Sequence, residues 1–73
     1  MDHRIGLIAG SGQFPLIFSS KARRSGFEVF AAAFLKETDP SLEADVSAIE
    51  WMHLGQVRRL IDFFKRNAVS QAV

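Results

Sequence analysis

Residues 4–15 read RIGLIAGSGQFP, and this stretch decides which fold class the rest of the chain has to fit. Arg4 to Ala9 is a short apolar run that ends at Gly10 and Gly12, a pattern typical of a buried strand followed by a tight turn. From Gln13 to Ser25 the spacing of apolar residues becomes that of an amphipathic helix. A strand that runs through a glycine turn into a helix predicts the first unit of an α/β domain.

The predicted first helix has clear start and stop signals. Pro15 falls in the first turn, where no intrahelical hydrogen bond is lost, and Gly26 supplies the left-handed position that ends the helix. The basic residues Lys21, Arg23 and Arg24 lie off its apolar face. That apolar face, which we expect to pack on the sheet, consists of Phe14, Ile17, Phe18 and Ala22.

The alternation of strands and helices continues along the chain. Phe27 to Phe34 predicts a central strand that is covered on both faces. Asp39 and Pro40 provide the cap and the first position of a short helix that runs to about Val46. Ala48 to His53 then predicts a third strand, interrupted by one glutamate.

The last predicted helix runs from Gln56 to Asn67. Its apolar face, with residues at i, i+3, i+4 and i+7, consists of Val57, Leu60, Ile61 and Phe64. After this helix, Ser70 to Val73 begins to resemble a fourth strand.

Strands separated by helices of this length imply right-handed crossovers and a parallel sheet. The expected architecture is an α/β Rossmann-like three-layer sandwich with a small parallel sheet, in the order βαβαβα with the start of a fourth strand. We expect the first strand to lack a neighbour on one side, where more chain or another copy has to cover it. Residues 1–73 are expected to be a single Rossmann-like domain, and because so short a chain has marginal stability alone, we expect it to be a piece of something larger.

Composition excludes several classes of protein. Nine Lys and Arg against eight Asp and Glu leave a net charge of +1, which supplies no field for steering towards nucleic acid. The absence of cysteine excludes disulfides and thiolate metal sites. The apolar run from Ile5 to Ala9 is too short for a signal peptide or a transmembrane helix. We therefore expect a soluble, cytoplasmic chain.

Ligands of parallel α/β sheets bind at the carboxyl ends of the strands, which directs attention to the loops at residues 10–13, 35–39 and 54–56. In the first loop, Gly10 and Gly12 let backbone N–H groups approach an anion, and a helix N-terminus follows. The pattern is equally consistent with a tight turn that binds nothing. A dinucleotide fingerprint is disfavoured because Pro15 stands where its third glycine is required, and a P-loop is excluded because no Gly-Lys-Ser/Thr follows.

Three segments together resemble a known family. Gly6-Leu7-Ile8-Ala9-Gly10-Ser11-Gly12-Gln13-Phe14-Pro15, Glu37-Thr38-Asp39-Pro40, and Leu54-Gly55-Gln56 ahead of Phe63-Phe64-Lys65-Arg66 are similar to the N-terminal domain of LpxI-type UDP-2,3-diacylglucosamine pyrophosphatases. The resemblance covers essentially all of the chain. It implies an enzyme of lipid A biosynthesis that hydrolyses UDP-2,3-diacylglucosamine to UMP and lipid X with Mg²⁺ or a similar divalent metal. It also implies that the catalytic acid and the metal site belong to a C-terminal domain, so that this domain has no catalytic residue and no metal ligand.

The resemblance assigns the loops of this domain to a wall of the substrate cleft, where an acylated sugar phosphate or nucleotide sugar binds. The implied substrate-binding residues are Gly10, Ser11, Gly12, Gln13, Thr38, Asp39, Gly55 and Gln56. The expected partners are the C-terminal domain and further copies of the chain, with at most a peripheral association with the inner membrane. Two other functions stay open: a nucleotide-sugar or phosphate-binding module of another enzyme, and a pure oligomerisation domain.

Some conspicuous residues have simpler interpretations. His53 could contact a phosphate, but an isolated histidine is more often structural. Asp39 could bind Mg²⁺, but its position before Pro40 is already explained by helix capping. The basic residues of the helices could favour an anionic membrane surface, or they could simply form solvated faces.

Overall fold

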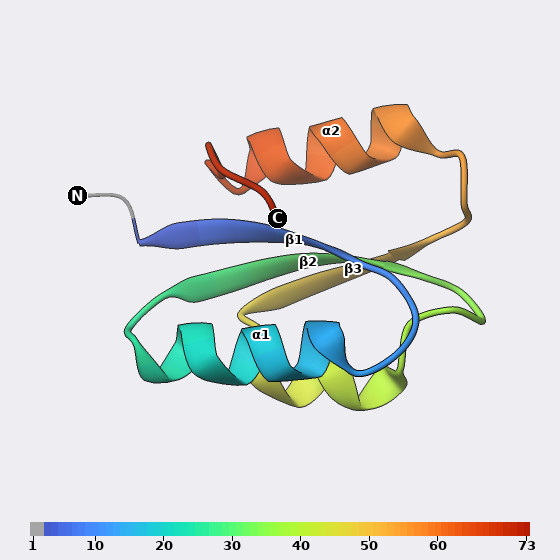
Figure 1. Cartoon of the computed structure of the whole chain (residues 1–73). Helices are drawn as coiled ribbons and strands as arrows, with labels where there is room; N and C mark the ends of the chain where they lie inside the picture. Colours follow the sequence, from blue (N-terminus) through green and yellow to red (C-terminus); the bar gives the residue numbers. More distant parts are fainter. Residues whose placement is uncertain (1–2) are drawn as a thin grey trace.

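The computed structural model describes residues 3–73, and its elements alternate as the sequence predicts (Figure 1). Each element begins and ends at, or next to, the predicted residue. The short helix η1 is a 3₁₀-helix, capped by Asp39 as expected. The elements are β1 (Arg4–Ala9), α1 (Phe14–Arg24), β2 (Glu28–Phe34), η1 (Pro40–Asp45), β3 (Ala48–Met52) and α2 (Val57–Arg66).

The three strands form a parallel sheet in the order β1-β2-β3. Gly6 pairs with Phe30 of β2, and Phe30 pairs with Ala48 of β3. β2 is the central strand, and its residues Val29 to Ala33 are all buried. The prediction that this strand is covered on both faces is therefore confirmed.

Helices cover both faces of the sheet, which makes the three-layer Rossmann-like sandwich that was expected (Figure 1). On one face, α1 and η1 enclose a core centred on Leu7, Val29 and Leu42. On the other face, α2 packs through Phe63 against Met52 and the neighbouring residues of β2. No helix in residues 3–73 has both the length and the apolar character needed to cross a membrane.

The predicted apolar face of α1 is only partly correct, because Phe18 and Ala22 do pack on the core. Phe14 and Ile17 are exposed, whereas Pro15 and Ser19 are buried together with Ala22. The sheet surface beneath the helix includes alanines, so small residues on the helix allow its backbone to approach closely. Phe14 and Ile17 therefore lie along the flank of the helix instead of in the core.

The predicted apolar face of α2 is also only partly correct. Leu60 and Phe64 do pack on the core, but Val57 and Ile61 are exposed, and the most buried residue of the helix is Phe63. Phe64 packs closely because Gly6 on β1 has no side chain, and a Cβ atom at Gly6 would lie 2.8 Å from Cε1 of Phe64. Phe63, the next residue on the helix, is buried with Phe30 and Met52 in the same core.

The expectation of an unpaired edge on β1 is wrong. Residues 71–73 lie parallel to β1, with a bridge between Gly6 and Ala72. The Gly6 amide donates to the Gln71 carbonyl at 2.8 Å, and the Val73 amide donates to the Gly6 carbonyl at 2.9 Å. Because these residues follow α2 and return to β1, they occupy the fourth position of a Rossmann-like sheet, and the β1 edge gives no reason to expect a second copy there.

Candidate functional site

The Gly10–Gln13 loop lies at the point where the chain connections diverge. From β1 the chain passes through α1 on one face of the sheet to reach β2. The neighbour on the other side of β1, residues 71–73, is reached through α2 on the opposite face. The carboxyl end of β1 is therefore a topological switch point, the place where open α/β sheets bind ligands.

The Gly10–Gln13 loop is exposed and its glycines face open space. No heavy atom of the surroundings lies within 4 Å of where a Cβ atom would stand at Gly10 or Gly12. Gly12 has a φ of 85°, a conformation that side chains with a Cβ atom disfavour. The side chain of Gln13 does not cap the start of α1. The backbone N–H groups of Phe14 and Leu16 in the first turn are therefore left to bind solvent or an anion.

Thr38 connects the loop at residues 35–39 to the end of β1, directly before the Gly10–Gln13 loop. Its side chain is almost fully buried, and its hydroxyl group donates to the Ala9 carbonyl at 2.8 Å. The same hydroxyl accepts a hydrogen bond from the Phe34 amide at 2.9 Å. Among the implied substrate-binding residues, Thr38 is thus placed where it fixes the loops relative to each other.

Asp39 is exposed beside this bond and is occupied with helix capping. Its Oδ1 atom accepts from the Ser41 amide at 3.0 Å and from the Ser41 hydroxyl at 2.9 Å. These two bonds, the backbone one first, hold the pKa of Asp39 below its usual value. The capping interpretation of Asp39 is confirmed.

The third loop is held by its own turn. Gly55 has a φ of 93°, and the Oε1 atom of Gln56 accepts from the His53 amide at 2.7 Å. Gln56 therefore keeps its side-chain NH₂ group for solvent or a ligand. His53 contributes its backbone to this turn, and its imidazole ring is part of an exposed residue.

Two hollows lie beside the strand ends, and some of the residues that line them were not among the predicted site residues. The first, of about 480 Å³, is lined by Leu35, Lys36, Thr38, Pro40 and Trp51. Lys36 has a φ of 70°, rare for a residue other than glycine, and nothing in the sequence signals it. Trp51 of β3 is half-buried and forms a wall of this hollow.

The second hollow, of about 460 Å³, is polar and lies beside α2, where Gly55 and Gln56 form part of its wall. Glu50 binds Arg59 and Arg66, each at 2.8 Å. The hydrogen bond from Arg59 lowers the pKa of Glu50, and Arg66 acts in the same direction. These ion pairs fasten α2 to β3, and the single carboxylate of Glu50 is shared between both arginines.

The residues present do not fit a divalent metal. Within residues 3–73, no group of three or more His, Asp or Glu side chains lies close enough together to hold an ion. Asp39, one of two carboxylates in the loop at residues 35–39, is bound to Ser41. No step of a metal-dependent reaction can be derived from these residues.

Comparison with known proteins gives one match. A family model described as "LpxI N-terminal domain" matches residues 4–73, which is nearly all of the chain. No curated protein and no solved structure is similar enough to count as a match. The matched range contains all three strand-end loops, and it agrees with the resemblance seen in the sequence.

Proposed function

The chain belongs to the LpxI N-terminal domain family, and on that premise we propose that it is the substrate-binding domain of a UDP-2,3-diacylglucosamine pyrophosphatase. Such an enzyme hydrolyses the pyrophosphate of its substrate to give UMP and lipid X in lipid A biosynthesis. In this proposal the Gly10–Gln13 loop holds the sugar phosphate, and the loops at Asp39 and Gln56 form the adjoining wall. A C-terminal domain outside residues 1–73 supplies the catalytic acid and Mg²⁺.

The observation that carries the proposal is the geometry of the Gly10–Gln13 loop. It is exposed, lacks Cβ atoms at Gly10 and Gly12, and stands at the switch point of the sheet ahead of α1. Backbone N–H groups in such a loop approach a phosphate without steric hindrance, and the dipole of the following helix favours negative charge. In this proposal the loop binds the substrate and does not react with it, because residues 3–73 hold no cluster of side chains for a metal ion.

Binding is tested by NMR titration of the 73-residue chain in detergent. We expect UDP-2,3-diacylglucosamine and lipid X to shift the amide signals of residues 10–13 and Gln56 more than those at the opposite end of the sheet. No release of UMP is expected from the chain alone, with or without Mg²⁺. Shifts confined to residues outside the three strand-end loops would contradict the proposed site, and metal-dependent UMP release would contradict the division of roles between domains.

The variant that probes the loop most cleanly is Gly10→Val. Gly10 does not have a positive φ, so a β-branched residue fits its backbone and only obstructs the open space above it. We expect binding of the sugar phosphate to weaken about tenfold, as for the loss of one charge-assisted hydrogen bond of about 1.5 kcal/mol. Gly12→Val also obstructs the loop, but at a φ of 85° it adds backbone strain, so its effect on binding cannot be separated from its effect on folding.

Ser47→Val is the matched control for Gly10→Val. Ser47 is exposed at the amino end of β3, far along the chain from the loop, and only its backbone amide is bonded, to the Val29 carbonyl. The Ser47→Val variant should bind ligands as the unchanged chain does.

Comparison of UDP-2,3-diacylglucosamine with UDP-N-acetylglucosamine separates the proposed function from its alternatives. Equal affinity for both would favour a general nucleotide-sugar module, and the absence of any response would favour an oligomerisation domain.

A further inference from the structure

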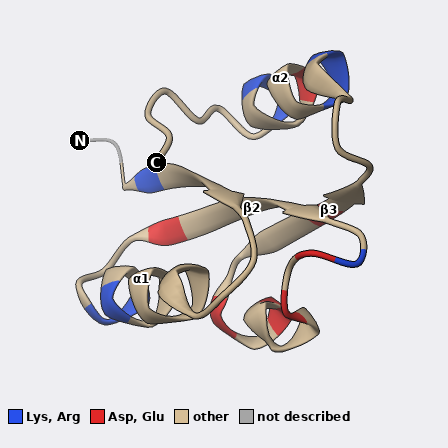
Figure 2. Ribbon diagram, turned by 45° about the vertical axis from the view of Figure 1, so that its right-hand side comes forward, with Lys and Arg blue, Asp and Glu red and all other residues tan. Residues whose placement is uncertain are grey.

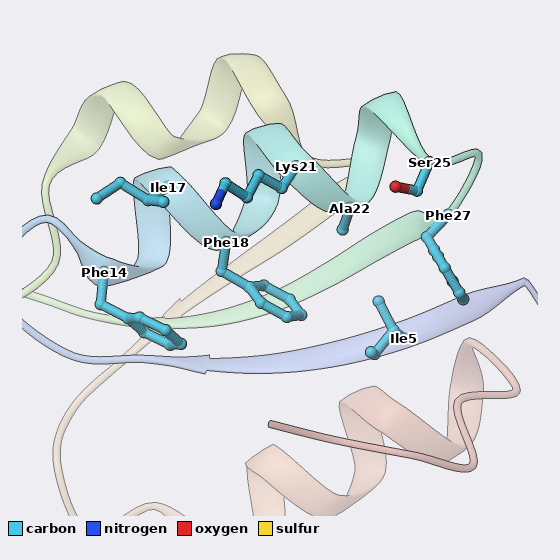
Figure 3. Close-up of a pocket in the computed structure, with 8 residues that line it drawn as sticks. All are labelled: Ile5, Phe14, Ile17, Phe18, Lys21, Ala22, Ser25 and Phe27. Atoms are coloured by element: carbon cyan, nitrogen blue, oxygen red, sulfur yellow. The ribbon is translucent and has the colours of Figure 1, made fainter.

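An apolar groove of about 360 Å³ runs between α1 and the adjacent edge of β1 (Figure 3). Phe14 and Phe18 lie along its length with ring centroids 5.9 Å apart, and Ile5 and Phe27 close its far end. Ile17 and Lys21 stand on its upper rim. The groove is far from the polar hollow on α2, because it lies on the other face of the sheet.

The side chains around this groove are unusually exposed for their size. Phe14 is 59% exposed, Ile17 52% and Phe27 39%. They are contiguous, since the spacing of residues 14, 17, 18 and 21 places one stripe along the helix. Isolated apolar residues on a surface are ordinary, but a contiguous apolar patch with a polar rim marks an interaction surface.

The charges on α1, the helix that lines the groove, are all of one sign. α1 contains Lys21, Arg23 and Arg24 and no acidic residue, as Figure 2 shows. Arg23 binds Asp45 of η1 at 2.9 Å, and Arg24 donates to Ser20, its neighbour on the helix. The ammonium group of Lys21 has no ion-pair partner in the part of the chain that the structure describes. It therefore stands at the rim of the apolar stripe as an uncompensated positive charge.

The apolar stripe and the basic residues beside it indicate which kind of partner fits the groove. A second copy that covered the groove through a two-fold axis would bring two copies of the basic helix together, with no acidic residue of α1 to compensate them. A bilayer that contains anionic lipid offers both things the surface needs, an apolar layer for the aromatic rings and phosphates for the lysine.

We propose that the face formed by Phe14, Ile17, Phe27 and Lys21 docks on the surface of an anionic lipid bilayer. The apolar side chains enter the boundary between headgroups and acyl chains, and Lys21 pairs with lipid phosphate. α1 then lies in the plane of the interface with its small-residue face still on the sheet. Because Phe14 directly follows Gln13, docking also places the strand-end loop beside the membrane.

Vesicle co-sedimentation of the 73-residue chain tests this surface, and it needs no enzymatic activity. We expect binding to vesicles of phosphatidylglycerol and phosphatidylethanolamine, weak binding to phosphatidylcholine alone, and a decrease as salt concentration rises. Phe14→Gln should reduce the partition coefficient about tenfold, because one large apolar side chain no longer leaves water. Lys21→Gln should reduce it about fivefold.

The chain offers closely matched controls on α2. Val57 is 60% exposed and Ile61 43%, so Val57→Gln and Ile61→Gln remove similarly exposed apolar groups from the opposite face of the sheet. Lys65→Gln removes a charge there. None of the three should change vesicle binding, and all the variants should unfold at denaturant concentrations near that of the unchanged chain.

Three results would overturn the proposal. The first is equal binding to anionic and neutral vesicles, or no binding to either. The second is an equal loss of binding in the α2 controls, which would indicate unspecific adhesion. The third is a dimer in analytical ultracentrifugation that Phe14→Gln dissociates while vesicle binding is unchanged, which would assign the groove to a second copy.

Discussion

Replacing Thr38 by valine should destabilise the protein strongly although the side chain keeps its shape. The hydroxyl group is buried, donates to Ala9 at 2.8 Å and accepts from Phe34 at 2.9 Å. In Thr38→Val the Phe34 N–H loses its acceptor, which costs about 1–3 kcal/mol for a buried donor, and the lost bond to Ala9 adds about 1 kcal/mol. The total of roughly 2–4 kcal/mol is large beside the total stability, about 4–11 kcal/mol, of a domain this size.

The assay is equilibrium urea unfolding of Thr38→Val beside Thr38→Ser. The serine variant keeps both hydrogen bonds and loses one methyl group, so we expect it to lose only about 1 kcal/mol. If the valine variant unfolds within about 0.5 kcal/mol of the original chain, the hydroxyl group does not hold the loops together. If the serine variant loses as much stability as the valine variant, packing of the methyl group contributes as much as the two hydrogen bonds of the hydroxyl group.

Three further substitutions test the packing. Ser19→Ala should raise the unfolding free energy by about 1 kcal/mol, since Oγ of Ser19 is buried and has no hydrogen-bond partner among residues 3–73, and alanine favours the helix; a lower urea midpoint would contradict this. Gly6→Ala should lower the midpoint, because the new Cβ atom would meet the Phe64 ring at 2.8 Å, and an additional Phe64→Leu exchange should restore part of the loss. Glu50→Gln should cost at most about 1 kcal/mol at pH 7, since the arginines that bind Glu50 are half-exposed or more. Because the folded state lowers the pKa of Glu50, this contribution is present above its usual pKa of 4.5 and is lost as pH falls through the lowered value, so the two stability curves should converge in acid.

The order of elements was predictable because the chain marks each boundary chemically. Gly10 and Gly12 end the first strand, Gly26 ends the first helix, and Asp39 with Pro40 starts η1. These signals act within a few residues, so they can be recognised without knowledge of the fold.

The helix faces and the sheet edge were not predictable in the same way. A stripe such as Phe14 and Ile17 looks like a core face in sequence, but Pro15 and Ser19 fit more closely on a sheet of small residues. Residues 71–73 are too few to show the alternation of a strand, and their partner lies at the other end of the chain. The buried position of Thr38 depends on how its loop folds back over Ala9, which no local pattern encodes.

The pairing of Gly6 with Ala72 joins the two ends of the chain, and this has consequences for the order in which the sheet opens. Closing so long a loop costs about 1 kcal/mol more in chain entropy than closing the loop between β1 and β2. The outer residues should therefore detach first while β1 stays bound to β2. Successive amides of one parallel strand point to opposite neighbours, so those of Gly6 and Ile8 face the outer segment and that of Leu7 faces β2. In deuterated water, we expect the amide protons of Gly6 and Ile8 to exchange sooner than that of Leu7. Alternate residues of β1 would then report on detachment of the outer segment and on separation of β1 from β2.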